Sequence, residues 1–151
     1  MVKIGPWGGT GGTPRDIRVG TRPRYLETIK VCSTDIYGGR IYGFFFVYND
    51  CRGQSIPVGF WGSSYKGYQD TITMGYGEHV NYVSGTTDNT GVRSLMFGTN
   101  KGIQRTYGYP SGKTFSVPMQ QEGGEVIGFF GRADACLVAL GAYIAQPDSI
   151  F

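Results

Sequence analysis

Glycine interrupts this sequence at short intervals, and its spacing argues against a helical fold. The chain has 151 residues, of which 26 are glycine, without the period of three that collagen requires. No window of about a dozen residues keeps apolar side chains at i, i+3, i+4 and i+7 without a glycine or proline interruption. Short apolar segments bounded by glycine are typical of all-β domains. A chain of this length is also the usual size of a single domain.

We expect β-strands throughout the chain, because short runs rich in aromatic and β-branched residues recur along it. The turn sequences "NDCRG" and "TNKG" lie between such runs, and their Asn and Gly residues favour hairpins. The expected strands cover residues 25–33, 40–50, 55–61, 70–76, 79–85, 92–100, 103–109, 114–119, 125–131 and 136–144.

The expected strands form a repeat. Residues 27–64 contain a strand, a loop, a strand, a hairpin, a strand and an aromatic-glycine corner, and residues 78–112 follow the same order. Residues 124–144 supply only the first half of this unit, and residues 2–12 resemble the missing half. The corners "GPWGG", "GFWGS" and "YGYPSG" would then be equivalent. The sequence therefore predicts an all-β prism of three pseudo-repeated antiparallel sheets, the third closed by the N-terminal strand.

The composition of the chain limits the classes of function that we expect for it. A formal net charge of +3 is too small for a typical nucleic-acid-binding protein. The three cysteines, Cys32, Cys51 and Cys136, have no metal-ligand spacing and fit reduced thiols, although an exposed Cys51 could link two chains. We find neither a signal peptide nor an apolar segment long enough to span a membrane, so we expect a cytoplasmic or nucleocytoplasmic protein.

Three ordered motifs give the chain a family resemblance. They are "KIGPWGGTGG" (3–12), "KTFSVPM" (113–119) and the pair "IGFFGR" and "LVALGAYI" that flanks residues 133–136. On these motifs the chain resembles the jacalin-related lectins of plants, and especially their mannose-type branch. The resemblance covers residues 2–145. We therefore expect a lectin domain over residues 1–146 and a short tail over 147–151.

The resemblance implies a type I β-prism that binds sugar and is not an enzyme. It implies mannose- or glucose-containing glycans as partners, no cofactor, and a homodimer or higher homo-oligomer. Independently of the resemblance, His79 is the single histidine and has no nucleophile or acidic cluster near it in sequence, so a catalytic role is not expected.

The resemblance also implies a primary sugar site between the N-terminal glycine loop and the last inter-strand loop. Gly12 matches the glycine-loop donor, and Ala135 and Cys136 match the two positions that offer backbone N–H groups. Glycine lets the backbone approach a sugar ring closely, and a carboxylate forms the stronger, charge-assisted hydrogen bonds to its hydroxyls. In the family signature Gly-x-x-x-Asp, this chain has Asp134 in place of the glycine and Val138 in place of the aspartate.

These two changes leave two interpretations open. Asp134 could supply the carboxylate from the other end of the loop and hold a sugar in a new pose. Alternatively, sugar binding is lost at this loop, because Val138 cannot accept a hydrogen bond. An aspartate where the family has glycine also raises the question of whether this position needs a positive φ, which few residues other than glycine adopt.

Two further candidate sites lie elsewhere. Some members of the family carry a second sugar site on the first repeat, and here Asp35 and Gly62 match it, whereas Gly38 replaces its second acid. Four arginines within residues 15–24 could bind sulfated glycans or another polyanion: Arg15, Arg18, Arg22 and Arg24. The alternative to a lectin is therefore a prism scaffold that has lost sugar binding and acts in protein–protein or polyanion binding.

Overall fold

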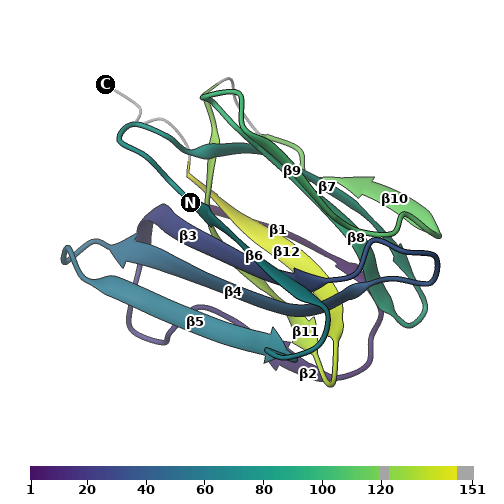
Figure 1. Ribbon diagram of the computed structural model, residues 1–151. Helices are drawn as coiled ribbons and strands as arrows, with labels where there is room; N and C mark the ends of the chain where they lie inside the picture. Colours follow the sequence, from purple (N-terminus) through teal and green to yellow (C-terminus); the bar gives the residue numbers. More distant parts are fainter. Residues whose placement is uncertain (120–122, 146–151) are drawn as a thin grey trace.

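The computed structural model describes residues 1–119 and 123–145, and every regular element in these ranges is a β-strand (Figure 1). The expected tail, residues 147–151, lies outside the described residues. Within the described ranges, no helix is long and apolar enough to cross a membrane. The strands are β1 (Val2–Gly8), β2 (Thr13–Arg15), β3 (Pro23–Ser33), β4 (Ile41–Asp50), β5 (Ser55–Gly62), β6 (Tyr68–Thr73), β7 (Val80–Asp88), β8 (Gly91–Thr99), β9 (Gln104–Gly108), β10 (Lys113–Ser116), β11 (Glu125–Ala133) and β12 (Leu137–Ala145).

The strands form two hydrogen-bonded sheets, whose strands pair antiparallel. The smaller sheet has four strands in the order β5-β4-β3-β6. The larger has eight strands, with the order β1-β12-β11-β7-β8-β9, β10 beside β7 and β2 beside β11. One residue pair, Val126 with Val80, connects β11 to β7. Because of this single pair the hydrogen bonding defines two sheets, where the sequence predicted three.

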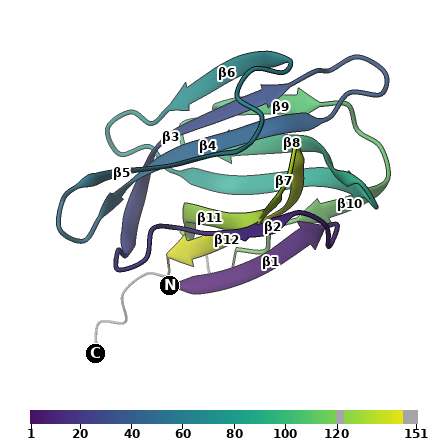
Figure 2. The same cartoon turned by 90° about the horizontal axis from the view of Figure 1, so that it is seen from below.

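The two ends of the chain meet in the larger sheet. β1 pairs antiparallel with β12, from Val2 opposite Ile144 to Gly8 opposite Ala139 (Figure 2). The register shifts between Ile4 and Trp7, where the glycine–proline corner interrupts the strand. This pairing places the N-terminal glycine loop next to the β11–β12 connection.

Aromatic side chains from distant parts of the chain fill the centre of the molecule. Phe44 on β4, Phe97 on β8 and Phe129 on β11 are all buried. The ring centroids of Phe44 and Phe129 lie 4.9 Å apart, and Phe97 lies 6.0 Å from Phe129 and 6.2 Å from Phe44. Burial of each such ring contributes about 1.5–3 kcal/mol, so these contacts hold the two sheets together.

The structure departs from the sequence prediction at several strand ends and in one short strand. The strand expected at 114–119 ends at Ser116, and the strand expected at 79–85 continues to Asp88. The strand expected at 70–76 ends at Thr73, because the next residues form a turn in which the Glu78 carboxylate accepts the backbone N–H of Gly75 at 2.8 Å. The short strand β2 was not predicted, since three residues carry too little periodicity to be recognised.

Candidate functional site

The loop between β11 and β12, residues 134–136, carries an aspartate at its first position. The Asp134 Oδ1 atom accepts the backbone N–H of Cys136 at 3.1 Å, and the Asp134 N–H donates to the Cys136 carbonyl at the same distance. No residue other than glycine has a positive φ among the described residues, so Asp134 has an ordinary backbone conformation. The position therefore does not need glycine in this chain, because the side chain itself closes the turn.

Gly12 lies directly against this loop. Its φ is +68°, and a Cβ at this position would come within 2.5 Å of the Ala133 carbonyl oxygen. The Arg132 side chain fixes the approach by donating to the carbonyls of Gly11 and Gly12 at 2.9 and 3.0 Å. The N-terminal glycine loop and residues 134–136 therefore form one continuous surface. Their positions in the sequence do not show this contact by themselves.

Val138 faces the glycine loop and is almost inaccessible. Its side chain is 3 % exposed, and its carbonyl accepts the backbone N–H of Gly9 at 3.0 Å. One of its methyl groups would lie 3.2 Å from a Cβ on Gly9. At position 138 this chain therefore presents only buried methyl groups, which cannot accept a hydrogen bond from a sugar hydroxyl.

The backbone N–H groups of Ala135 and Cys136, which are expected to face a ligand, differ in whether they already form a hydrogen bond. Ala135 is exposed, and its N–H has no hydrogen-bond partner in the described part of the chain. The Cys136 N–H is already bonded to Asp134. The Asp134 carboxylate is exposed, and its Oδ2 atom is unpartnered among the residues described. The loop thus offers one donor and one carboxylate oxygen to solvent.

The turn between β7 and β8 adjoins this site, and its role was not predicted from the sequence. Asp88 accepts the backbone N–H of Thr90 at 2.8 Å, as Asp134 does from Cys136, and also accepts Nε of Arg93 at 2.7 Å. Burial alone would raise the pKa of Asp88, but the hydrogen bonds from Thr90 and Arg93 outweigh it and hold the pKa well below its usual value. In the sequence, Asp88 lies two residues before Thr90, whose amide it accepts. An aspartate at this spacing is typical of such turns and could have predicted this one.

Arg40 connects the first repeat to the same turn. Its guanidinium donates to the Thr90 carbonyl at 2.9 Å. A Cβ on Gly91 would lie 2.5 Å from this guanidinium and 3.3 Å from the Val138 Cα atom. The turn between β7 and β8 therefore lies between Arg40 of the first repeat and the start of β12.

Asp35 and Gly62, the residues of the expected second site, lie on different elements. Asp35 is exposed on the loop between β3 and β4, and Gly38 in the same loop has a φ of +82°. A Cβ on Gly62 would meet the Tyr42 carbonyl oxygen at 2.2 Å and the Cys136 Cα atom at 3.3 Å. Gly62 therefore borders the primary loop through Cys136.

The arginine patch lies mostly in solvent. Arg18, Arg22 and Arg24 are exposed, whereas Arg15 is half-buried on β2, where its Nε atom has no partner among the described residues. The salt bridges that the described residues form are Lys3–Asp16, Arg93–Asp88 and Arg105–Asp70. The four arginines of the patch are thus not paired with carboxylates in the described part of the chain.

The remaining titratable groups do not form a metal site in residues 1–119 and 123–145. The three cysteines are free thiols: Cys32 is buried, Cys51 is exposed in its hairpin as expected, and Cys136 is half-buried in the loop. Burial raises the pKa of the Cys32 thiol.

Comparison with known proteins identifies the family of the chain. Residues 4–143 match the family model described as a jacalin-like lectin domain. The chain is 39 % identical over 147 residues to horcolin from Hordeum vulgare, which covers 95 % of this chain and 96 % of horcolin. A mannose-binding jacalin-related lectin from Ananas comosus superposes with a TM-score of 0.83 at 33 % identity, covering 97 % of this chain and 98 % of that one. The mannose-binding lectin from Champedak superposes with a TM-score of 0.80 at 32 % identity, covering 96 % of both chains.

The fold thus defines the class of protein, an all-β prism of the lectin type. The chain belongs to the jacalin-related lectins.

Proposed function

We propose that this chain is a lectin for mannose- or glucose-containing glycans, with a weakened primary site in which Asp134 replaces the carboxylate missing at position 138. The observation that carries the proposal is the exposed Asp134 carboxylate, whose Oδ1 atom is fixed by Cys136 and whose Oδ2 atom is unpartnered among the residues described. The mannose binding named for the lectins from Ananas comosus and Champedak supports the sugar class. The protein acts by binding and has no catalytic activity.

The contacts available explain why the site is weak. A carboxylate that accepts a sugar hydroxyl contributes about 1.5–3 kcal/mol, and the fixed Oδ1 atom lets Oδ2 do so without a large loss of side-chain freedom. Two contacts of the family site are missing, since the Cys136 N–H is bonded within the loop and Val138 is buried. Each unsatisfied sugar hydroxyl costs about 1–3 kcal/mol, which is about one to two powers of ten in affinity. A homodimer or higher oligomer would offset this weakness through multivalent binding.

A glycan array at low and at physiological salt tests the proposal. We expect binding to neutral mannose- or glucose-terminated glycans with little salt dependence, because the contacts are hydrogen bonds within a small site. A wild-type protein that ignores neutral glycans, while Val138→Asp gains mannoside binding, would show that the site is degenerate.

The unpaired arginines favour a second candidate function, binding of a polyanion such as a sulfated glycan by Arg15, Arg18, Arg22 and Arg24. In this case the array signal would be confined to sulfated glycans, and it would fall steeply between low and physiological salt.

We also infer that the eight-stranded sheet consists of two four-stranded units, which gives the three pseudo-repeated sheets of a type I prism. The single pair Val126–Val80 at the junction supports this division. So does a contact that recurs in the three corners. A Cβ on Gly8, Gly62 or Gly108 would lie 2.2–2.3 Å from a carbonyl oxygen of the adjacent strand, namely that of Val138, Tyr42 or Arg93.

A further inference from the structure

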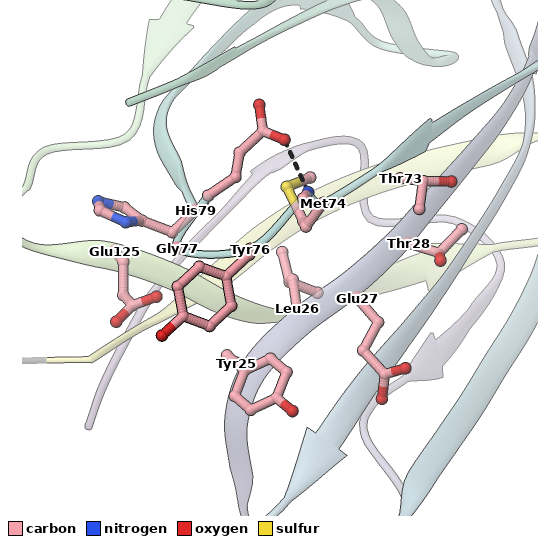
Figure 3. Close-up of a pocket in the computed structure, with 12 residues that line it drawn as sticks. Tyr25, Leu26, Glu27, Thr28, Thr73, Met74, Tyr76, Gly77, His79 and Glu125 are labelled. Carbon is pink, nitrogen blue, oxygen red and sulfur yellow. Dashed lines mark hydrogen bonds between the residues drawn. The ribbon is translucent and has the colours of Figure 1, made fainter. Parts of the chain in front are cut away.

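A pocket lies at the end of the molecule opposite the candidate sugar site. It has a volume of about 620 Å³, within the usual range of about 300–1,000 Å³ for small-molecule sites, and is formed by the start of β3, the turn between β6 and β7, and the start of β11 (Figure 3). β11 runs from Glu125 in this pocket to Ala133 at the sugar site, so about 26 Å of strand separates the two at about 3.3 Å per residue.

The pocket has an apolar side with aromatic rings at its rim. Leu26 is buried and Met74 half-buried, while Tyr25 is 41 % exposed and Tyr76 is fully exposed. Figure 3 shows the Tyr25 and Tyr76 rings and the Leu26 side chain among the residues that line the pocket. The Arg24 guanidinium lies 5.3 Å from the Tyr25 ring centroid. The Tyr76 ring has no aromatic or cationic partner among the described residues, so it is available to a ligand.

The pocket also has an acidic side. Glu125, Glu78 and Glu27 line it, whereas His79 is the one basic side chain of the lining. Two of the three carboxylates are engaged: Glu78 accepts Gly75 and Thr99, and Glu27 accepts the Ser55 hydroxyl at 2.7 Å.

Glu125 differs from the other two carboxylates. It is half-buried and has no hydrogen bond or salt bridge from its side chain to the described residues. Burial raises the pKa of Glu125, and the nearby His79 partly offsets this effect. A desolvated carboxylate is stabilised by a cation that reaches it, and Glu125 and Tyr76 line the same pocket (Figure 3).

We infer that this pocket binds a small organic cation, a protonated amine carried on an apolar or aromatic body, independently of the sugar site. The apolar body covers Leu26 and Met74 and stacks on Tyr76, and the ammonium group donates to the Glu125 carboxylate. Tyrosine faces attract cations, and the excess of carboxylates over basic groups disfavours anions.

A ligand series that varies charge at constant shape tests this inference. Phenethylammonium, the neutral phenethyl alcohol and the anionic phenylacetate are titrated into the whole protein while backbone amide NMR shifts are recorded. We expect phenethylammonium to bind about tenfold more tightly than phenethyl alcohol, the equivalent of one charge-assisted hydrogen bond, and phenylacetate to bind most weakly. The shifts should map to residues 25–28, 73–79 and 125.

Variants of the pocket distinguish the contribution of the Glu125 charge from that of the shape of the pocket. Glu125→Gln, which keeps the size of the side chain, should reduce phenethylammonium affinity to that of the alcohol and leave the alcohol unchanged. Tyr76→Ala, on an exposed turn, should weaken both ligands. Asp35→Asn removes the same charge at the other end of the molecule and should change neither. Methyl mannoside binding should be unaffected by Glu125→Gln, so the test is independent of the proposed lectin function.

Three results would overturn the inference: equal affinity along the charge series, unchanged selectivity in Glu125→Gln with unaltered thermal stability, or no saturable shift in these three segments with phenethylammonium.

Discussion

The Oδ1 atom of Asp134 accepts the backbone N–H of Cys136 at 3.1 Å. Together with the Asp134 N–H bond to the Cys136 carbonyl, this bond closes the loop that the family resemblance marks as the sugar site. It also occupies one of the two amides that would face a ligand there. The Asp88–Thr90 pair repeats the arrangement in the adjoining turn at 2.8 Å. An aspartate that replaces glycine in the loop thus has a structural role as well as a proposed role in binding.

A carboxylate at position 138 should increase the affinity for methyl mannoside and decrease the free energy of unfolding. Val138 is 3 % exposed and packs against Gly9, so Val138→Asp places a charge in a nearly buried position. We expect an increase of about one to two powers of ten in methyl mannoside affinity, together with a loss of about 1–3 kcal/mol in the free energy of unfolding.

Calorimetric titration and urea denaturation measure these two quantities for Val138→Asp. Val138→Asn is the matched control, because it has the same size without the charge and should gain much less affinity. An Asn variant that binds as well as the Asp variant would mean that charge is not what position 138 lacks.

Gly12 should be far less tolerant of substitution than its neighbour Gly11. A Cβ on Gly12 would lie 2.5 Å from the Ala133 carbonyl oxygen at a φ of +68°, whereas a Cβ on Gly11 would meet nothing within 4 Å. We therefore expect Gly12→Ala to lower the free energy of unfolding by about 1–3 kcal/mol and to weaken mannoside binding.

Gly11→Ala should be within about 0.5 kcal/mol of wild type. Urea denaturation of the two variants checks this difference. Equal stability of both would show that the glycine loop does not pack against β11 as described.

Asp88 should make part of the stability dependent on acid pH. Its pKa is lowered in the folded state, so its contribution is fully present above the unfolded value of about 3.9 and is lost as the pH falls toward the folded value. The difference in melting temperature between wild type and Asp88→Asn should be constant from neutral pH to about pH 5 and shrink below about pH 4.

Thermal scans of both proteins at several pH values measure that difference. Asp35→Asn, at an exposed acid without hydrogen bonds to the described residues, is the control for the loss of one surface carboxylate. A difference that grows toward acid pH would contradict the role assigned to the Asp88 hydrogen bonds.

Local sequence patterns predicted most of the strands and the site loop, because hairpin strands and glycine corners depend on residues close together in the chain. The family resemblance implied that Gly12 and residues 134–136 belong to one site, but the close approach of Gly12 to Ala133 is seen only in the structure. The sequence did not predict the contact of Arg40 with Thr90, since fifty positions separate the two and neither belongs to a motif. The pocket at Glu125 escaped prediction for the same reason, because three separate segments form it.

The sequence also left the conformation of Asp134 open. Position 134 could have required a positive φ, which would have strained an aspartate. In the structure, the side chain bonds to the Cys136 amide and the backbone keeps a negative φ. Residue type alone cannot distinguish an aspartate whose side chain closes the turn from an aspartate whose backbone is strained.

The central claim is that the Asp134 carboxylate binds the sugar, and calorimetric titration of methyl mannoside into wild type and Asp134→Asn tests it most directly. Asparagine keeps an Oδ1 atom for the Cys136 amide, so the loop should stay closed while the charge is lost. We predict measurable binding to wild type and an affinity about ten- to one-hundredfold lower for Asp134→Asn, with an unchanged melting temperature. Equal affinity of the two proteins, or no binding by wild type, would contradict the claim.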